Sequence, residues 1–146
     1  MDAIERLADV AVGDLATWLA GLPPEAFARL ADPAWGNAAE RCRPIAEALV
    51  AEHFPGCCVS GVGLFVLAPG QMHPAHRDEQ PPEWRTRVHI PVLTNPDAVA
   101  IVDSGTLHLE VGVAYTFDTR QTHAVANRGT TPRVHLVFDV YRNPER

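Results

Sequence analysis

Residues 67–92 read LAPGQMHPAHRDEQPPEWRTRVHIPV and place three His, three Arg and an Asp between two apolar, strand-like runs. In an extended chain, residues two positions apart point to the same face of a sheet. His76 and Asp78 can therefore converge on one point, and so can Arg85, Arg87 and His89. We interpret this stretch as half of a metal site that the rest of the chain is built to hold.

The composition favours one acidic domain. At 146 residues the chain has a common single-domain size, and we expect one domain over 1–146, with a helical part at 1–55 and a β-rich core at 57–142. The net charge of −6 argues against a nucleic-acid or anionic-membrane binder, because both need a basic surface. All twelve basic residues are Arg, and four lie near the histidines, which favours a small anionic ligand.

The sequence also predicts a cytoplasmic protein. Its three Cys form neither a disulfide framework nor a paired-cysteine zinc site. Acidic residues stand near the N-terminus where a signal peptide would be basic. The run from Phe54 to Met72 is free of charged residues, but its Gly and Pro are typical of strands and turns rather than of a membrane helix.

The first third of the chain is expected to be helical. Apolar residues at helical spacing predict an amphipathic helix over 2–20, and Pro24 is a plausible start for a short second helix that carries Phe27 and Leu30. The same pattern predicts a third helix over 43–53, with Pro44 near its start. We expect irregular chain around residues 35–37.

The remaining sequence is typical of short β-strands separated by Gly, Pro, Asn and Asp. The strands are expected at residues 59–68, 71–78, 85–93, 98–103, 106–109, 113–118, 122–127 and 133–141. A series of this kind fits a jelly-roll or cupin-like barrel, with the N-terminal helices packed on one sheet. The predicted fold class is therefore mainly β.

Two His-x-acid pairs are possible sources of metal ligands, His76-x-Asp78 and His108-x-Glu110. With 7 His and 18 acids in the chain, such a pair arises by chance about once, so neither is specific by itself. His76 lies inside the His- and Arg-rich stretch, whereas the His108 pair runs into a turn and is more typical of an exposed strand end. The first pair is therefore the better candidate.

The third ligand must come from farther along, and His123 and His135 are the choices. Arg133 follows His123 by ten residues across a turn at 127–129, so a hairpin could place both on one inner surface. Two imidazoles and one carboxylate on one face of an octahedral metal leave three positions open for a bidentate co-substrate and dioxygen. Arg133 could then bind the far end of a chelated dicarboxylate.

Several separated motifs occur in order along the β-rich part. They are Leu67-Ala68-Pro69-Gly70, His76-Arg77-Asp78, Arg85-Thr86-Arg87-Val88-His89-Ile90-Pro91, Phe117-Asp118, His123-Ala124-Val125-Ala126-Asn127 and Arg133-Val134-His135-Leu136-Val137-Phe138-Asp139-Val140. Together they resemble the aspartyl/asparaginyl β-hydroxylase family over about residues 64–142. The resemblance implies a double-stranded β-helix fold and an oxygenase that depends on Fe(II) and 2-oxoglutarate.

The resemblance also implies roles for individual residues. His76, Asp78 and His123 match the Fe(II) ligands, and Arg133 matches the arginine that binds the distal carboxylate of 2-oxoglutarate. Arg87 and His89 match residues that line the pocket and contact the co-substrate or an acidic substrate. Asp78 places the chain nearer the bacterial amino-acid-modifying relatives, because the vertebrate peptide-modifying members have Gly at this position.

The expected reaction is hydroxylation of an amino-acid or peptidyl side chain, of Asp or Asn type or in a free amino acid. It would consume dioxygen and 2-oxoglutarate and release succinate, with ascorbate as the reductant in vitro. Arg85 could contact a substrate carboxylate, and Trp84 could shield the mouth of the site, although a solvated arginine and simple loop packing are the plainer interpretations. Two alternatives stay open: a non-catalytic cupin-like module that binds a metal or a small acid, and a cupin enzyme that uses another metal.

Overall fold

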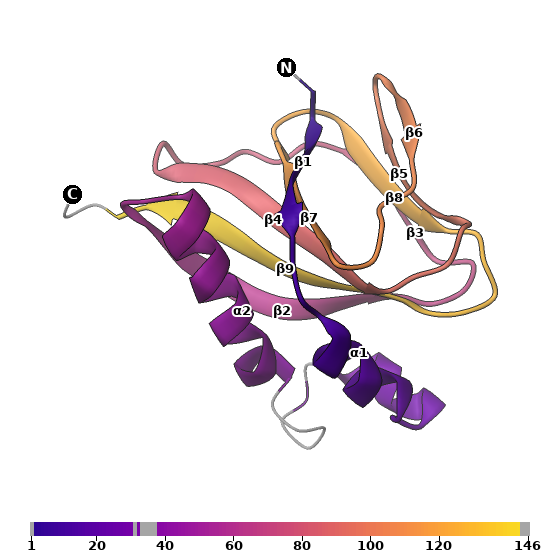
Figure 1. Cartoon of the computed structure of the whole chain (residues 1–146). Coiled ribbons are helices and arrows are strands. Elements are labelled where there is room, and N and C mark those ends of the chain that lie inside the picture. The colour runs from indigo at the N-terminus through magenta and orange to yellow at the C-terminus, as the bar shows by residue number, and fades with distance from the viewer. Residues whose placement is uncertain (1, 31, 33–37, 144–146) are drawn as a thin grey trace.

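The strands of the computed structural model, which describes residues 2–30, 32 and 38–143, form two antiparallel sheets (Figure 1). The five-stranded sheet has the order β1-β7-β4-β9-β2, and the four-stranded sheet has the order β3-β8-β5-β6. The strands are β1 (Ile4–Asp9), β2 (Cys57–Leu67), β3 (Met72–His76), β4 (Trp84–Leu93), β5 (Ala98–Val102), β6 (Gly105–Leu107), β7 (Val113–Phe117), β8 (His123–Asn127) and β9 (Arg133–Arg142). The predicted mainly β, double-stranded β-helix architecture is confirmed.

The helical segments lie outside the five-stranded sheet (Figure 1). They are α1 (Gly13–Ala20), the 3-10 helix η1 (Pro24–Arg29) and α2 (Ala38–His53). Leu19 of α1 and Leu49 of α2 belong to one buried cluster with Val88 of β4 and Phe138 of β9, as expected for helices packed on one sheet. The third helix begins earlier than predicted, so Pro44 lies inside α2.

The predicted helix over residues 2–20 is wrong in its first half. Residues Ile4–Asp9 form edge strand β1, which pairs antiparallel with β7, and α1 begins only at Gly13. Strand β1 covers an edge of β7 whose backbone N–H and C=O groups would otherwise be unpaired. A tertiary contact has therefore overridden the helical spacing of the apolar residues. The irregular chain expected at 35–37 lies outside the described residues.

Strand β9 separates the helix-facing core from the interior between the sheets. Alternate residues of a strand point to opposite faces. Leu136 and Phe138 pack in the helix-facing cluster, whereas Arg133 and Asp139 line a pocket that residues from both sheets enclose. A largely buried strand thus has one apolar face that holds the helices and one partly polar face that serves the pocket.

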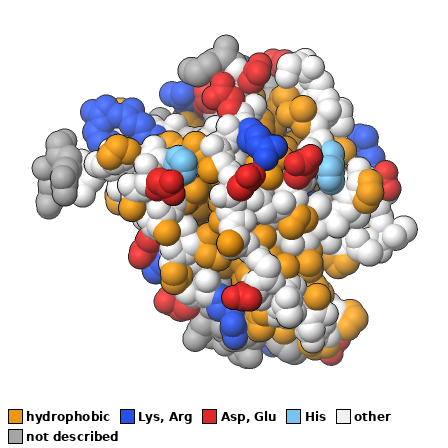
Figure 2. All heavy atoms as spheres, in the orientation of Figure 1, with side chains coloured by type: hydrophobic (Ala, Val, Ile, Leu, Met, Phe, Trp, Pro, Cys, Tyr) orange, Lys and Arg blue, Asp and Glu red, His pale blue; other side chains and the backbone are white. Residues whose placement is uncertain are grey.

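The surface carries charge of both signs. Acidic and basic side chains are interspersed on the face shown in Figure 2, with hydrophobic side chains between them. The three cysteines, Cys42, Cys57 and Cys58, are free. Within residues 2–30 and 38–143, no helix combines the length and the apolar character needed to cross a membrane.

Candidate metal centre and co-substrate pocket

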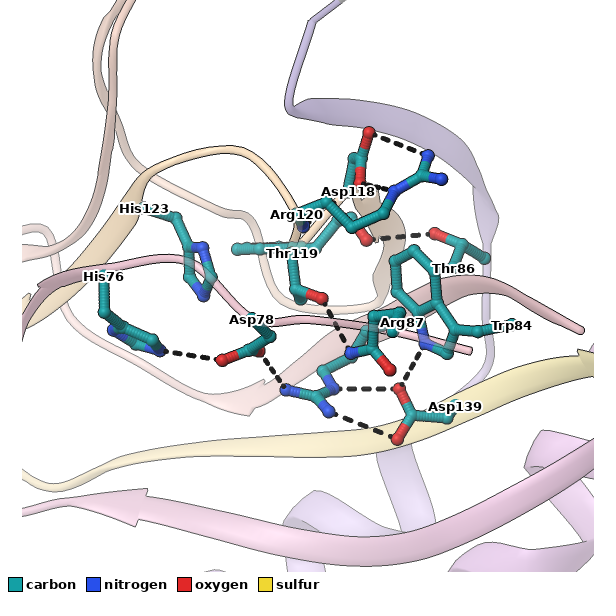
Figure 3. Close-up of polar contacts among 12 residues, drawn as sticks. His76, Asp78, Trp84, Thr86, Arg87, Asp118, Thr119, Arg120, His123 and Asp139 are labelled. Carbon is teal, nitrogen blue, oxygen red and sulfur yellow. Dashed lines mark hydrogen bonds and ion pairs between the residues drawn. The ribbon is translucent and has the colours of Figure 1, made fainter. Parts of the chain in front are cut away.

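His76, Asp78 and His123 come together where strands β3 and β8 meet (Figure 3). His76 lies directly opposite His123 in the pairing of these strands, and the ring centroids are 4.4 Å apart. Asp78 follows β3, and its backbone N–H donates to the Thr119 carbonyl at 2.8 Å. One potential ligand atom from each of the three side chains lies within 4.8 Å of the other two. The structure thus brings together the three residues that the sequence proposes as ligands.

Backbone carbonyl groups orient both imidazole rings. His76 Nδ1 lies 2.9 Å from the Pro74 carbonyl, and His123 Nδ1 lies 2.8 Å from the Gln121 carbonyl. Because a carbonyl oxygen only accepts, Nδ1 of each ring carries a proton, and Nε2 is the nitrogen that can bind a cation. Two imidazole nitrogens and a carboxylate are a suitable donor set for Fe(II). The residues present therefore fit the metal that the resemblance implies.

Arg133 is buried in the pocket that also contains the two histidines. This pocket has a volume of about 350 Å³ and is lined by His76, His123 and Arg133, among others. Arg133 is only 4% exposed, and its Nε has no hydrogen-bond partner among the described residues. Burial lowers the pKa of Arg133 to about 10, so the guanidinium is still charged at neutral pH. A buried cation with an unpaired donor is suited to bind a small anion.

Two further histidines extend from Arg133 into the interior. Arg133 Nη1 lies 3.1 Å from His135 Nδ1, and His135 Nδ1 in turn lies 3.1 Å from His89 Nδ1. Because a guanidinium only donates, His135 Nδ1 is the acceptor, and His89 carries its proton on Nδ1. Burial, and then the charge of Arg133, hold the pKa of both imidazoles well below the ordinary 6.5. Both rings are therefore neutral at physiological pH.

The stability of the protein is expected to fall as the pH drops from about 7.5 to about 5.5. Since His89 and His135 have a lower pKa in the folded state, the unfolded chain takes up protons below pH 6.5 that the folded chain does not bind. Each histidine contributes on the order of 1 kcal/mol to this loss. Urea unfolding at both pH values should show a smaller loss in a His89→Gln/His135→Gln variant than in the unsubstituted protein. An equal loss in the two proteins would contradict the assignment.

Arg87 lines the pocket, but acidic groups already surround its guanidinium. Its Nε and Nη2 donate to the two carboxylate oxygens of Asp139 at 2.9 and 3.2 Å. Its Nη1 lies 3.5 Å from Oδ2 of Asp78. The indole N–H of Trp84 donates to the same Asp139 carboxylate at 3.1 Å. Arg87 is therefore less available to an anionic ligand than Arg133.

Arg85 does not line this pocket. The pairing of β4 with β9 shifts register between Trp84 and Thr86. An irregularity of this kind changes which residues share a face of the strand. Arg85 is exposed and lines a separate depression with Phe54 and Arg120. Trp84 is 3% exposed and bonded to Asp139. The substrate contacts predicted for Arg85 and Trp84 stay predictions that their positions do not support.

The predicted hairpin between His123 and Arg133 is wrong, although the two residues do share an inner surface. Strand β8 pairs with β3 and β5 in the four-stranded sheet, whereas β9 pairs with β4 and β2 in the other sheet. The chain after Asn127 therefore passes from one sheet to the other. His123 and Arg133 line the same pocket because residues of both sheets enclose it.

Sequence reasoning missed much of the apolar pocket lining, which includes Phe65, Phe117, Val125 and Val137. Strand alternation would have identified Val137, because it lies on the same face of β9 as Arg133. The alternation does not run unbroken along β2, because its pairing with β9 shifts register between Ser60 and Gly63. The face on which Phe65 lies therefore could not be predicted from the first residues of the strand. His108 lies outside the metal-ligand group, and its Nδ1 contacts the Ala98 carbonyl at 3.0 Å.

The sequence matches the aspartyl/asparaginyl β-hydroxylase family over residues 31–143, which is most of the chain. The chain belongs to this family. It is thereby a member of the Fe(II)- and 2-oxoglutarate-dependent hydroxylases. The match to the family begins at residue 31, well before residue 64, at which the resemblance based on the sequence motifs begins. No curated protein matches the sequence.

Solved structures share the fold at low sequence identity. AviO1 from Streptomyces viridochromogenes Tue57 has a TM-score of 0.68 at 16% identity, covering 98% of this chain and 90% of AviO1. The viral collagen prolyl hydroxylase vCPH from Paramecium bursaria Chlorella virus-1, in its 2OG complex, has a TM-score of 0.64 at 10% identity over 96% of each chain. A prolyl-4-hydroxylase from Pseudomonas putida has a TM-score of 0.59 at 17% identity, covering 96% of this chain and 86% of its own. These likenesses establish the fold.

Proposed function

We propose that the chain hydroxylates an amino-acid or peptidyl side chain with Fe(II), dioxygen and 2-oxoglutarate. The observation that carries this proposal is the buried guanidinium of Arg133, whose Nε has no partner in the described part of the chain and which lies in one pocket with His76 and His123. A metal site alone suits many enzymes. A metal site beside an unpaired buried cation suits a dicarboxylate that chelates the metal at one end and needs a cationic partner at the other.

His76, Asp78 and His123 would hold Fe(II) on one face and leave neighbouring positions for the two co-substrates. When bound, the metal and its co-substrates supply the oxidation, in which 2-oxoglutarate loses CO₂ to become succinate and one oxygen atom of O₂ enters a substrate C–H bond as a hydroxyl group. The Nδ1–H groups of both histidines hold the rings with Nε2 toward the site. The chain itself thus supplies position and charge.

Arg133 would bind the distal carboxylate of 2-oxoglutarate. Two parallel charge-assisted hydrogen bonds from a guanidinium match the geometry of a carboxylate. His135 accepts a hydrogen bond from Nη1 at 3.1 Å and, being neutral, orients the guanidinium without offsetting its charge. His89 also lines the pocket, and its contact with the co-substrate is part of the proposal.

The substrate would approach from the exposed side of the pocket. The side chain of His76 is 48% exposed whereas His123 is buried, so the site opens to solvent on the β3 side. Exposed Phe65 and His73 line the same pocket. Family membership supports an Asp- or Asn-type side chain, free or in a peptide, as the substrate class.

Purified protein supplied with Fe(II), ascorbate, 2-oxoglutarate and oxygen is expected to release succinate slowly even without its substrate. The measurement is succinate formation by NMR, with matched samples that lack oxygen or metal as controls. No succinate from metal-loaded protein would contradict the enzyme and favour the non-catalytic cupin-like module. Turnover with Mn or Zn that does not need 2-oxoglutarate would instead favour an enzyme of another metal.

A further inference from the structure

A continuous line of charged and polar groups runs from His76 through Asp78 and Arg87 to Asp139 (Figure 3). Oδ1 of Asp78 faces His76 Nε2 at 3.6 Å. Oδ2 of the same carboxylate faces Arg87 Nη1 at 3.5 Å. The two oxygens of Asp78 therefore have different partners, one on the side of the histidines and the other on the side of the arginine.

Asp139, which is itself held by Trp84, fixes the position of the Arg87 guanidinium. Arg87 lies directly opposite Asp139 in the pairing of β4 with β9, and Asp139 accepts from its Nε and Nη2. A fork of two parallel bonds restricts rotation of the guanidinium more than one bond does. Buried Trp84 donates to the same carboxylate at 3.1 Å and restrains Asp139 in turn. The third nitrogen of the guanidinium is thereby directed at Asp78.

We propose that Arg87 is a positioning residue for Asp78. Locked by Asp139 and Trp84, it would hold Oδ2 of Asp78 and present Oδ1 alone to the metal. Binding through one oxygen keeps neighbouring coordination positions free for 2-oxoglutarate and dioxygen, whereas binding through both oxygens would occupy one of them. Partners that orient a ligand in this way commonly affect metal affinity. This inference rests on the metal site of the proposed function.

The test is a double-mutant cycle on Co(II) affinity, measured by visible absorption without any co-substrate. Arg87→Gln is expected to weaken Co(II) binding by about tenfold or more. In an Asp78→Ala background the same substitution should change the affinity by less than about twofold, because Arg87 acts through Asp78. Equal weakening in both backgrounds would overturn the proposal. Tighter binding after Arg87→Gln would also overturn it, because Arg87 would then act mainly as a repelling charge.

Two milder variants test the same role. Trp84→Phe keeps the aromatic ring but removes the donor to Asp139, and a loss of about two- to threefold in Co(II) affinity is expected. Arg87→Lys keeps the charge but loses the fork, so it should also weaken binding. Arg142→Gln, which changes an exposed arginine at the end of β9, serves as the control, and thermal unfolding checks that each variant folds. Unchanged affinity in both milder variants would overturn the proposal.

Failure of the metal site can be told apart from failure of the positioning role. If the unsubstituted protein binds no Co(II), or if His123→Ala leaves binding unchanged, the metal site is wrong and the role of Arg87 is wrong with it. If Co(II) binds through His123 and Asp78 but is insensitive to the Arg87 and Trp84 substitutions, only the positioning role is wrong.

Discussion

Substituting Arg133 with methionine is expected to weaken 2-oxoglutarate binding to the metal-loaded protein by at least about 30-fold, equivalent to about 2 kcal/mol. The guanidinium is buried, and its Nε has no hydrogen-bond partner among the described residues, so the carboxylate would lose a charge-assisted contact made in a site of low polarity. Isothermal titration calorimetry with Mn(II)-loaded protein measures the change.

The same substitution should leave the ligand-free protein equally stable or more stable. Burial lowers the pKa of Arg133 to about 10, which shows that the fold disfavours its charge. Thermal unfolding of the ligand-free variant checks this. Arg128→Met, at an exposed arginine in the connection between β8 and β9, is the matched control and should bind 2-oxoglutarate normally. Undiminished binding by Arg133→Met would mean that another cation holds the distal carboxylate.

Substituting Asp78 with alanine is expected to abolish iron-dependent succinate formation. It removes the only carboxylate of the His76, Asp78 and His123 group. Loss of a residue that merely orients a metal ligand weakens metal binding by roughly 10- to 100-fold, and the loss of a ligand itself should exceed this. A Co(II) titration separates lost binding from lost turnover. Asp103→Ala, at an exposed acid, should leave both unchanged. Full turnover by Asp78→Ala would show that the two histidines are sufficient to hold the metal.

Much of the fold was predictable because its signals are local. Turn residues and strand-length apolar runs predicted strands β2 to β9, each of which occurs close to its expected bounds. Strand β1 was not predictable in this way. The spacing of its apolar residues also suits a helix, and only the free edge of β7 makes the extended form the better choice.

The candidate ligands were also predictable, but the chain connection that brings them together was not. The His-x-acid spacing indicated His76 and Asp78, and the resemblance to the family, together with the spacing from Arg133, indicated His123 rather than His135. The hairpin expected to join His123 to Arg133 does not exist, because β8 and β9 belong to different sheets. The two residues meet only because the sheets enclose one pocket between them.

By itself, the sequence determined which chemical groups the site contains, because residue type and strand alternation are properties of the local chain. Only the tertiary structure decided which arginine is available to a ligand. Arg87 is neutralised by Asp139, which lies 52 positions away in the chain. Arg133 is buried, and no residue that the structure describes is a hydrogen-bond partner of its Nε. The charge that a ligand meets depends on the acids that the fold brings near each guanidinium. The distance in space between an acid and a guanidinium cannot be read from their spacing in the sequence.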